Sequence, residues 1–429
     1  MLHVHFVTLF PEFFTSPLAC GLMAKAEEKA LLKWTFHNPR DYSEDRHHHV
    51  DDSPYGGGPG MVLQVEPWAA CLREIETAGR MLLLTPSGKP FTQQMAREYA
   101  TCEHITILCG RYEGFDERIQ QCFPLEPVSV TDAVLNSGES AALCVFEAIA
   151  RLQKGFMGKD ASGEEESFSE GLLEYPQYTL PEVFEHREVP SVLLSGNHKA
   201  IAGFRREKSL ERTLFYRRDL LRDAPLTEAD AETLAAIPRE RCGRNLSFCL
   251  VHSPVRIEGK TGTSSLTNLD IHDIARISAS YGLGNFYVVT PLEDQRRLLE
   301  TIKEHWIKGS AAVSHPDRAY ALSKVCACET IDQAIDRMTY ATGMRPFVVA
   351  SSASWPKKGK TPILVPRMVR ERLLHEPVLL LLGTAQGLAR EAIDRCSGIL
   401  RPLRFLSYNH LSVRSAAAIL ADRILGDFD

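Results

Sequence analysis

Two stretches of this chain read alike: ITILCGRYEGFDERI at residues 105–119 and VLLLLGTAQGLAREAI at residues 378–393. Each is a continuous apolar run followed by two glycines four residues apart and then a helical pattern. Continuous rather than alternating hydrophobicity is typical of strands buried on both faces, as in parallel α/β sheets. About thirty residues later, each half has a polar loop that enters an Ala-rich helix, at 136–152 and 408–425. The repeated order predicts two related α/β domains.

Length and composition limit the class of protein. A chain of 429 residues exceeds one usual domain, and an apolar content of 44% is enough for real cores. No apolar run is long enough to span a bilayer, and residues 1–10 lack the basic region and cleavage site of a signal peptide. We therefore expect a cytoplasmic protein with no membrane contact. The cysteines show no framework spacing, and Cys109, Cys144 and Cys249 are expected as small core residues.

The net charge of −6 is unevenly distributed. Residues 1–245 carry 26 Lys and Arg against 37 Asp and Glu, whereas residues 246–429 carry 23 against 18. An acidic total argues against non-specific coating of nucleic acid, but local patches can still bind RNA. Basic clusters occur at 205–222, with interleaved acidic residues, and at Lys357, Lys358 and Lys360. The first cluster fits a phosphate-binding helix and a solvated helix face equally well.

The segment DDSPYGGGPG at residues 51–60 cannot be a helix or a strand interior. Such a loop exposes unpaired N–H groups that suit an anionic or polar partner, and we interpret it as functional rather than as a simple turn. The preceding His47, His48 and His49 can bind a metal weakly, but a solvated loop is the better interpretation, and we predict no metal site.

Two segments resemble nucleotide-binding motifs, but each lacks a required feature. PVRIEGKT at 254–261 resembles a phosphate-binding loop, but Pro254 replaces the first glycine and has no N–H to donate. Gly282 and Gly284 precede a strand instead of following one, so the dinucleotide fingerprint is absent. Nucleotide hydrolysis and dinucleotide binding are therefore not expected.

Residues 1–236 resemble the bacterial tRNA (guanine-N1)-methyltransferases. The matching motifs are NPRDY (38–42), VDDSPYGGGPGM (50–61), CGRYEGFDERI (109–119), SFSEGLL (167–173) and VPSVLLSGNH (189–198). Residues 246–429 resemble a second member of the same SPOUT superfamily. The motifs there are NLDIHDIARISASYGLGNFYVVTP (268–291), LLGTAQGL (381–388) and NHLSVRSAAA (409–418). Because members of the first family usually stop after one unit, the chain is expected to be a fusion.

The resemblance implies an α/β fold with two SPOUT-type parallel-sheet domains, each carrying a trefoil knot, and a small helical domain after the first. The implied segments are 1–160 (SPOUT methyltransferase domain), 161–171 (mobile lid loop), 172–237 (helical tRNA-binding domain), 238–245 (linker) and 246–429 (second SPOUT methyltransferase-like domain). The lid is expected to become ordered on tRNA and to close over the target base.

The resemblance also implies the reaction. Members of the family transfer the methyl group of S-adenosylmethionine (SAM) to N1 of the guanine 3′ of the tRNA anticodon, and they work as homodimers whose active site spans both subunits. The sulfonium is itself electrophilic, so no metal is needed to activate it, although Mg²⁺ can neutralise RNA charge. The alternative is an RNA-binding or regulatory protein in which the second half, or both halves, is catalytically inactive.

Methylation of guanine N1 requires removal of its proton and stabilisation of the charge that moves toward O6. In the family an aspartate before a Ser-Phe pair is the base, and an arginine at the end of the preceding helix assists it. Here these positions match Glu166 and Arg151. Glutamate keeps the carboxylate but extends it by one methylene. Glu165 or Asp160 could substitute for it.

The family match also assigns binding residues. Those for the cofactor in the first half are Thr85, Pro86, Gly110, Arg111, Tyr112, Glu113, Gly114, Val130, Thr131, Asp132, Ala133, Val134, Leu135 and Gly138. Those for the cofactor in the second half are Gly383, Gly387, Leu403, Leu406 and Ser412. Those for RNA are Asp51, Gly56, Gly57, Gly58, Arg205, Arg206, Arg212 and Arg276. Glycines and backbone amides are expected to hold the adenine and ribose.

Overall fold

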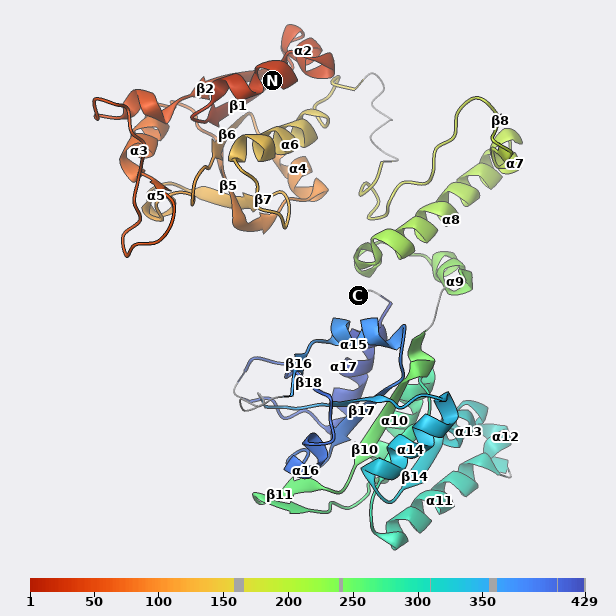
Figure 1. Cartoon of the computed structure of the whole chain (residues 1–429). Helices are drawn as coiled ribbons and strands as arrows, with labels where there is room; N and C mark the ends of the chain where they lie inside the picture. The colour runs from red at the N-terminus through yellow and green to blue at the C-terminus, as the bar shows by residue number, and fades with distance from the viewer. Residues whose placement is uncertain (158–165, 239–241, 309, 355–360, 407, 428–429) are drawn as a thin grey trace. The chain divides into compact units, whose positions relative to one another are not determined.

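The computed structural model describes residues 1–157, 166–238, 242–308, 310–354, 361–406 and 408–427 (Figure 1). The chain's contacts divide it into two compact units, 1–212 and 213–429. The division falls inside one long helix, α8 (His198–Tyr216). Each unit is built around its own sheet and its own cores.

The sheet of the first unit has five parallel strands in the order β2-β1-β6-β5-β7. Their bounds are β1 (Leu2–Val7), β2 (Leu32–His37), β5 (Arg80–Pro90), β6 (His104–Cys109) and β7 (Leu125–Ser129). The central β6 contains the sequence ITILC and is buried along nearly its whole length, as this mainly apolar run predicts. Parallel pairing brings the carboxyl ends of β5, β6 and β7 to one edge, where the chain's Gly-containing turns follow.

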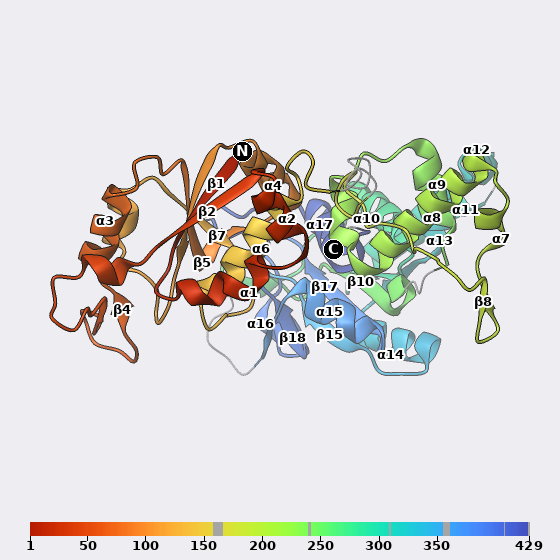
Figure 2. The same ribbon diagram turned by 90° about the horizontal axis from the view of Figure 1, so that it is seen from above.

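Helices cover both faces of this sheet, as Figures 1 and 2 show. Val4 and Phe6 of β1 share a core with Val145 and Phe146 of α6 (Gly138–Ala150). On the opposite face, Val7 packs in the core that holds α3 (Val65–Arg73). The other elements are η1 (Pro11–Phe14), α1 (Thr15–Leu18), α2 (Gly21–Glu28), η2 (Pro39–Tyr42), β3 (Asp51–Asp52), β4 (Val62–Leu63), α4 (Gln93–Ala100) and α5 (Arg118–Cys122).

The second unit holds a seven-stranded parallel sheet in the order β14-β13-β10-β17-β15-β18-β16. The strands are β10 (Leu246–Val251), β13 (Phe286–Val289), β14 (Val325–Cys328), β15 (Phe347–Ala350), β16 (Ile363–Leu364), β17 (Val378–Gly383) and β18 (Gly398–Leu400). The helices are α10 (Asn268–Ser280), α11 (Glu293–Ile307), α12 (Ser310–Ser314), α13 (Pro316–Ser323), α14 (Ile331–Thr342), α15 (Pro366–Leu373), α16 (Arg390–Ile393) and α17 (Val413–Leu425). A short hairpin joins β11 (Val255–Ile257) to β12 (Lys260–Gly262).

The five inner strands of the second sheet repeat the first sheet in order. If β17 is set against β6, the order β13-β10-β17-β15-β18 matches β2-β1-β6-β5-β7. The prediction of an α/β fold with two parallel-sheet domains is therefore confirmed. The trefoil knot stays a prediction.

The segment expected to be helical, 172–237, begins instead with a short hairpin, β8 (Val183–Phe184) and β9 (Arg187–Glu188). The helices start later, as α7 (Ser191–Leu194), α8, η4 (Arg218–Arg222) and α9 (Glu228–Ala236). Thr227 and Asp230 form a capping box that starts α9. The basic residues 205–216 lie on α8, where the sequence predicted a helix.

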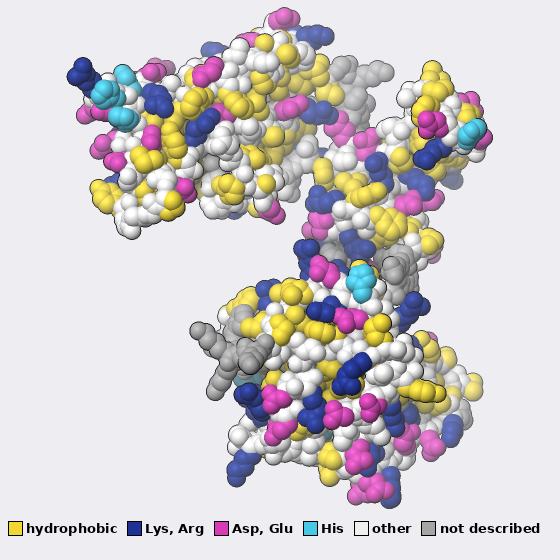
Figure 3. All heavy atoms as spheres, viewed as in Figure 1, with side chains coloured by type: hydrophobic (Ala, Val, Ile, Leu, Met, Phe, Trp, Pro, Cys, Tyr) yellow, Lys and Arg dark blue, Asp and Glu magenta, His cyan; other side chains and the backbone are white. Residues whose placement is uncertain are grey.

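Two further sequence expectations can be compared with the fold. Cys109 and Cys249 are buried in strands, but Cys144 is exposed, because the periodicity of α6 turns it away from the sheet. Within the described ranges, no helix is long and apolar enough to cross a bilayer. Figure 3 shows Lys and Arg interspersed with Asp and Glu over the visible face of both units.

Candidate functional site

A pocket of about 380 Å³ lies at the carboxyl edge of the first sheet. Its floor is the turn that follows β6. Tyr112 and Gly114 have φ of 56° and 105°, and the Gly114 N–H donates to the Arg111 carbonyl over 3.0 Å. Positive φ is easy for Gly114 and uncommon for Tyr112, so the turn is held in place by its surroundings. Its β-bridge from Phe115 to Leu63 ties it to the strand after the glycine loop.

Thirteen of the fourteen residues assigned to the first cofactor site line this pocket, and only Asp132 does not. Asn136 and Ser137, which fall within the stretch 130–138 that the resemblance implies, also line it. Sequence reasoning missed the remaining lining residues, which are Leu83, Leu84, Ser87, Phe115, Glu117, Gln120, Val128, Ser129 and Ala141. Several of these are strand-end residues of β5 and β7. Their position at the end of an apolar run could have identified them, because ligand-binding loops follow the carboxyl ends of parallel strands.

Gly138 sets the back wall of the pocket. Its N–H donates to the Gly110 carbonyl over 2.8 Å, which ties the start of α6 to the turn after β6. A Cβ at Gly138 would lie 2.6 Å from the Gly110 nitrogen, so no side chain fits between the two segments. The main-chain groups of Gly110 and Gly138 therefore line the pocket beside the apolar ends of β5 and β7. We call this surface the Gly138 cradle.

A buried carboxylate stands behind this wall. Glu139 is fully buried and accepts a hydrogen bond of 2.7 Å from the Thr8 hydroxyl and one of 3.4 Å from Arg111. The Arg111 guanidinium also lies 3.9 Å from the centre of the Phe10 ring. A buried charge needs such partners, and the pairing fixes the direction of the Arg111 side chain at the pocket. The sequence pointed to Arg111 but not to Glu139 or Thr8.

The two residues assigned to catalysis meet in the structure. Arg151 caps the carboxyl end of α6, where its N–H donates to the Glu147 carbonyl. Its guanidinium forms an ion pair with the Glu166 carboxylate. The side chain of Arg151 is 41% exposed and that of Glu166 is 34% exposed. The Ser167 hydroxyl accepts from the Glu174 N–H over 2.9 Å, which anchors the segment after Glu166. The alternative bases, Glu165 and Asp160, lie outside the described residues, as do residues 161–165 of the expected lid.

The ion pair and the pocket lie at opposite ends of α6. The helix has 13 residues, which corresponds to about 20 Å of rise between Gly138 and Arg151. Within one chain, therefore, the Arg151 end of the helix does not line the pocket.

The glycine loop assigned to RNA binding forms the tip of the β3–β4 hairpin, in which Asp51 opposes Leu63. Gly56, Gly57 and Gly58 all have positive φ and are exposed. The loop is joined to the turn after β6 because the Glu113 N–H donates to the Met61 carbonyl over 3.0 Å. The hairpin thus extends from the pocket as an open, polar arm.

The arginines assigned to RNA on α8 contact the segment that follows Glu166. Arg206 pairs with Glu170 over 3.2 Å, and Arg212 donates to the Glu174 carbonyl over 3.2 Å. The Arg205 guanidinium lies 4.6 Å from the centre of the Tyr175 ring. In this state all three arginines help to hold residues 170–175.

The second unit has a larger pocket, of about 790 Å³, at the corresponding sheet edge. The same turn forms it, since Ala385 and Gly387 have φ of 51° and 94° and the Gly387 N–H donates to the Thr384 carbonyl over 2.9 Å. Of the residues assigned to this site, Gly383, Gly387, Leu403 and Ser412 line the pocket. Leu406 is not among the lining residues, and neither is Arg276, which is exposed on α10.

Polar side chains that sequence reasoning missed also line the second pocket. His252 is buried, its Nδ1 lies 3.0 Å from the Ser264 hydroxyl, and burial lowers its pKa to about 4. Arg414 pairs with Asp270 over 3.2 Å. The second basic cluster, at Lys357, Lys358 and Lys360, lies outside the described residues.

Comparison with known proteins matches both halves. The family described as tRNA (Guanine-1)-methyltransferase TrmD matches residues 2–223, and the family described as SAM-dependent RNA methyltransferase matches residues 245–426. Proteins named tRNA (guanine-N(1)-)-methyltransferase from Oleidesulfovibrio alaskensis and Nitratidesulfovibrio vulgaris are 55% and 56% identical, each over 98% of this chain and 98% of their own. A protein of the same name from Geobacter sulfurreducens is 47% identical over 54% of this chain and 97% of its own.

The family match over residues 2–223 covers the unit that carries the Gly138 cradle and the Arg151–Glu166 pair. The relatives from Oleidesulfovibrio and Nitratidesulfovibrio match nearly the whole chain and so both sheets, whereas the Geobacter protein matches about half of it. This chain belongs to the tRNA (guanine-1)-methyltransferase family, and a domain of the SAM-dependent RNA methyltransferase family is fused behind its first half.

Proposed function

We propose that the first half transfers the methyl group of SAM to N1 of the guanine 3′ of a tRNA anticodon, with Glu166 as the base. The observation that carries this assignment is the Arg151–Glu166 ion pair. The family aspartate is a glutamate here, yet its carboxylate still meets the expected arginine. The extra methylene therefore does not prevent this contact.

Glu166 acts by accepting the N1 proton, which leaves negative charge on the base that spreads to O6. Because Arg151 holds the carboxylate in the resting state, the pair has to open when guanine enters. Arg151 is then free to donate to O6, where charge develops. The partial exposure of both side chains leaves room for this exchange of partners.

The first pocket fits SAM. The Gly110–Gly138 contact leaves main-chain groups exposed where any side chain would fill the space, and apolar strand ends flank them. When bound, SAM supplies an electrophilic methyl group on its sulfonium. Thr85, Ser129 and Asn136 add polar groups around the walls, and Leu83 and Val128 exclude water.

A second copy of the chain would complete the site. Because about 20 Å of α6 separates Arg151 from the Gly138 cradle, one chain cannot direct both at the same guanine. In a two-fold homodimer, the cradle of one subunit can face the Arg151–Glu166 pair of its partner. The length of α6 is thus the physical reason to propose a composite site.

The tRNA would lie along the glycine hairpin and α8. Arg205, Arg206 and Arg212 would exchange their contacts at 170–175 for phosphates, which couples tRNA binding to release of the segment after Glu166. Mg²⁺, if it participates, would neutralise RNA charge. For the second half we propose a second SAM site and an RNA substrate, supported by the repeated turn and the larger pocket.

Methyl transfer to tRNA transcripts tests the proposal. A transcript with guanosine 3′ of the anticodon should accept methyl groups, and a matched transcript with adenosine there should not. Methylation at N1 is identified by mass spectrometry of the nucleosides. Incorporation that is equal in both transcripts would assign the activity to another position, including one served by the second half.

A further inference from the structure

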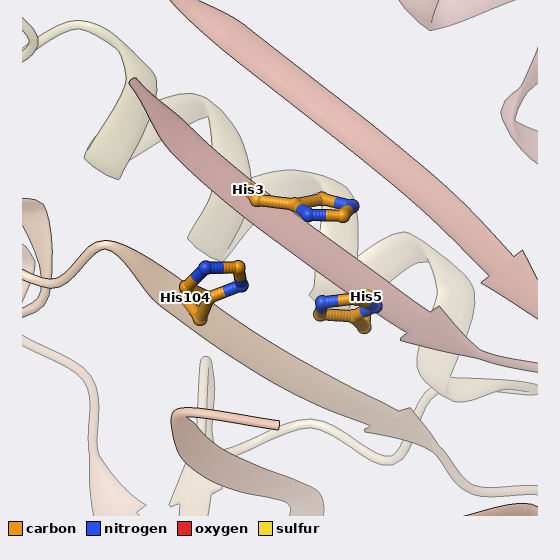
Figure 4. A group of neighbouring side chains, drawn as sticks. All are labelled: His3, His5 and His104. Carbon is orange, nitrogen blue, oxygen red and sulfur yellow. The ribbon is translucent and has the colours of Figure 1, made fainter. Parts of the chain in front are cut away.

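Three histidines converge on one face of the first sheet, at the edge opposite the cofactor pocket. His3 and His5 are alternate residues of β1, so they point to the same face. The register places His104, the first residue of β6, beside His3. One ring nitrogen from each of the three lies within 4.8 Å of the other two. Figure 4 shows the three rings close together on the same side of the two neighbouring strands.

Two of these rings carry a buried nitrogen without a partner. The Nε2 of His5 and the Nδ1 of His104 have no hydrogen bond among the described residues. His5 itself is only 7% exposed. A buried polar atom that lacks a partner is costly, and such an atom in a native protein often marks a group that binds something further.

The opposite side of two rings is held by β2. The His5 Nδ1 lies 3.0 Å from the His37 Nε2, and the His3 Nε2 lies 2.8 Å from the Thr35 hydroxyl. Each of these two rings therefore has one nitrogen engaged and one available. Hydrogen bonds of this kind from outer residues orient imidazoles that ligate metals.

Burial disfavours the protonated form of two of the three rings, those of His3 and His5. Burial is the main cause that lowers the pKa of His3, His5 and His37, and that of His5 falls to about 4. The neighbouring imidazoles and Lys33 on β2 lower the pKa of His3 and His5 further. Neutral imidazole is the form that binds metals.

We propose that His3, His5 and His104 bind a divalent first-row transition metal of the zinc class, with water in the remaining position. Nitrogen ligands at tetrahedral zinc lie about 3.3 Å apart. The ring nitrogens lie within 4.8 Å of one another, so they would have to move closer by about 1.5 Å at most. His3 and His104 are only partly buried and can turn to do so. An all-imidazole set excludes Mg²⁺ and Ca²⁺, which prefer oxygen ligands. The metal would join β1 to β6 and take no part in methyl transfer.

Cobalt titration of the full chain without an affinity tag tests this site. Co²⁺ should bind at one equivalent with visible absorption typical of a tetrahedral centre, and Zn²⁺ should displace it. His104→Gln should abolish the absorption. The matched control His48→Gln, in the exposed triplet at 47–49, should leave it unchanged. His37→Asn removes the group that orients His5 and should weaken Zn²⁺ binding by about tenfold or more.

Folding is checked separately by titrating each variant with SAM. A His104→Gln chain that binds SAM as the parent does but has lost cobalt supports the site. The site is overturned if the parent fails to bind Co²⁺ and Zn²⁺ at micromolar concentration. It is also overturned if His104→Gln keeps the same spectrum, or if His48→Gln removes it.

Discussion

The Arg151 guanidinium forms an ion pair with the Glu166 carboxylate at the carboxyl end of α6. The two residues are 15 positions apart, and residues 158–165 between them lie outside the described chain. This pair links the proposed base to the group that would stabilise charge on O6. It also places both at the end of α6 that faces away from the pocket of the same chain.

Replacement of Glu166 by Gln should reduce tRNA methylation by about 100-fold or more, because an amide cannot accept the N1 proton. SAM binding should remain unchanged, since Glu166 does not line the pocket. Single-turnover methylation and calorimetry measure the two effects. Glu170→Gln, in the same segment, is the matched control and should keep turnover. A Glu166→Gln enzyme with normal turnover would reassign the base to another carboxylate.

Mixed dimers should reveal the composite site. Ala133→Trp fills the first pocket from an exposed lining position, and Glu166→Gln removes the base. Each variant alone should be inactive. Randomly co-assembled dimers should recover about a quarter of the parental rate, because half are mixed and each mixed dimer keeps one intact pocket facing one intact base. No recovery despite verified mixing would mean that each chain builds its site alone.

The chain should bind SAM at two sites. Calorimetric titration should give a stoichiometry near two, because both units form the same turn and a pocket. Ala133→Trp and Ala353→Trp each add bulk at an exposed lining position of one pocket and should each reduce the stoichiometry to about one. If Ala353→Trp leaves the stoichiometry of the parent unchanged, the second pocket does not hold SAM.

Gly138→Ala should weaken SAM binding and destabilise the first unit by about 1–3 kcal/mol, because its Cβ overlaps the Gly110 backbone. Gly203→Ala is the control. Gly203 lies in α8 with no atom within 4 Å of an added Cβ, so alanine should stabilise the helix by about 0.5–1 kcal/mol. Urea denaturation and SAM titration check both. Equal effects of the two substitutions would contradict the close approach at the pocket wall.

The second unit should lose stability in mild acid. Burial lowers the pKa of His252 to about 4, and the nearby Asp270 carboxylate only partly opposes this shift. The unfolded chain therefore takes up a proton as the pH falls through about 6.5, while the folded unit does not until about 4. Stability should decline across that window, by about 2 kcal/mol at pH 5 relative to neutral pH. His252→Asn should reduce this pH dependence in urea denaturation, and identical pH profiles would count against it.

Much of the fold could be read from local pattern. The strand of residues 104–109 and that of 378–383 are unbroken apolar runs, and such runs belong to parallel sheets whatever surrounds them. The glycines after them marked the two turns that line the pockets, because close approach to the main chain is a local requirement. Cys144 shows the limit of this reasoning, because an apolar neighbourhood does not say which face of a helix is buried.

Local sequence patterns could not predict contacts between residues that are far apart along the chain. Glu139 looks like an ordinary helix residue, and only the packing of α6 against residues 8–10 and 111 makes it a buried anion. The separation of Arg151 from the pocket likewise follows from the direction in which α6 leaves the sheet edge. Strand order and helix direction are set by the packing of the whole core, which no short segment encodes.

The amino-acid sequence alone determined the two α/β units and their glycine turns, since each depends on neighbours along the chain. Arg151 and Glu166 were assigned through the resemblance to the family and not through local pattern. Only the tertiary structure decided that His104 stands beside His3, about a hundred residues away, through the parallel register of β1 and β6. It also decided that Arg151 and the Gly138 cradle lie at opposite ends of one helix. Both relationships arise from long-range packing, in which the free energy of burying each face of the sheet selects one arrangement of strands and helices.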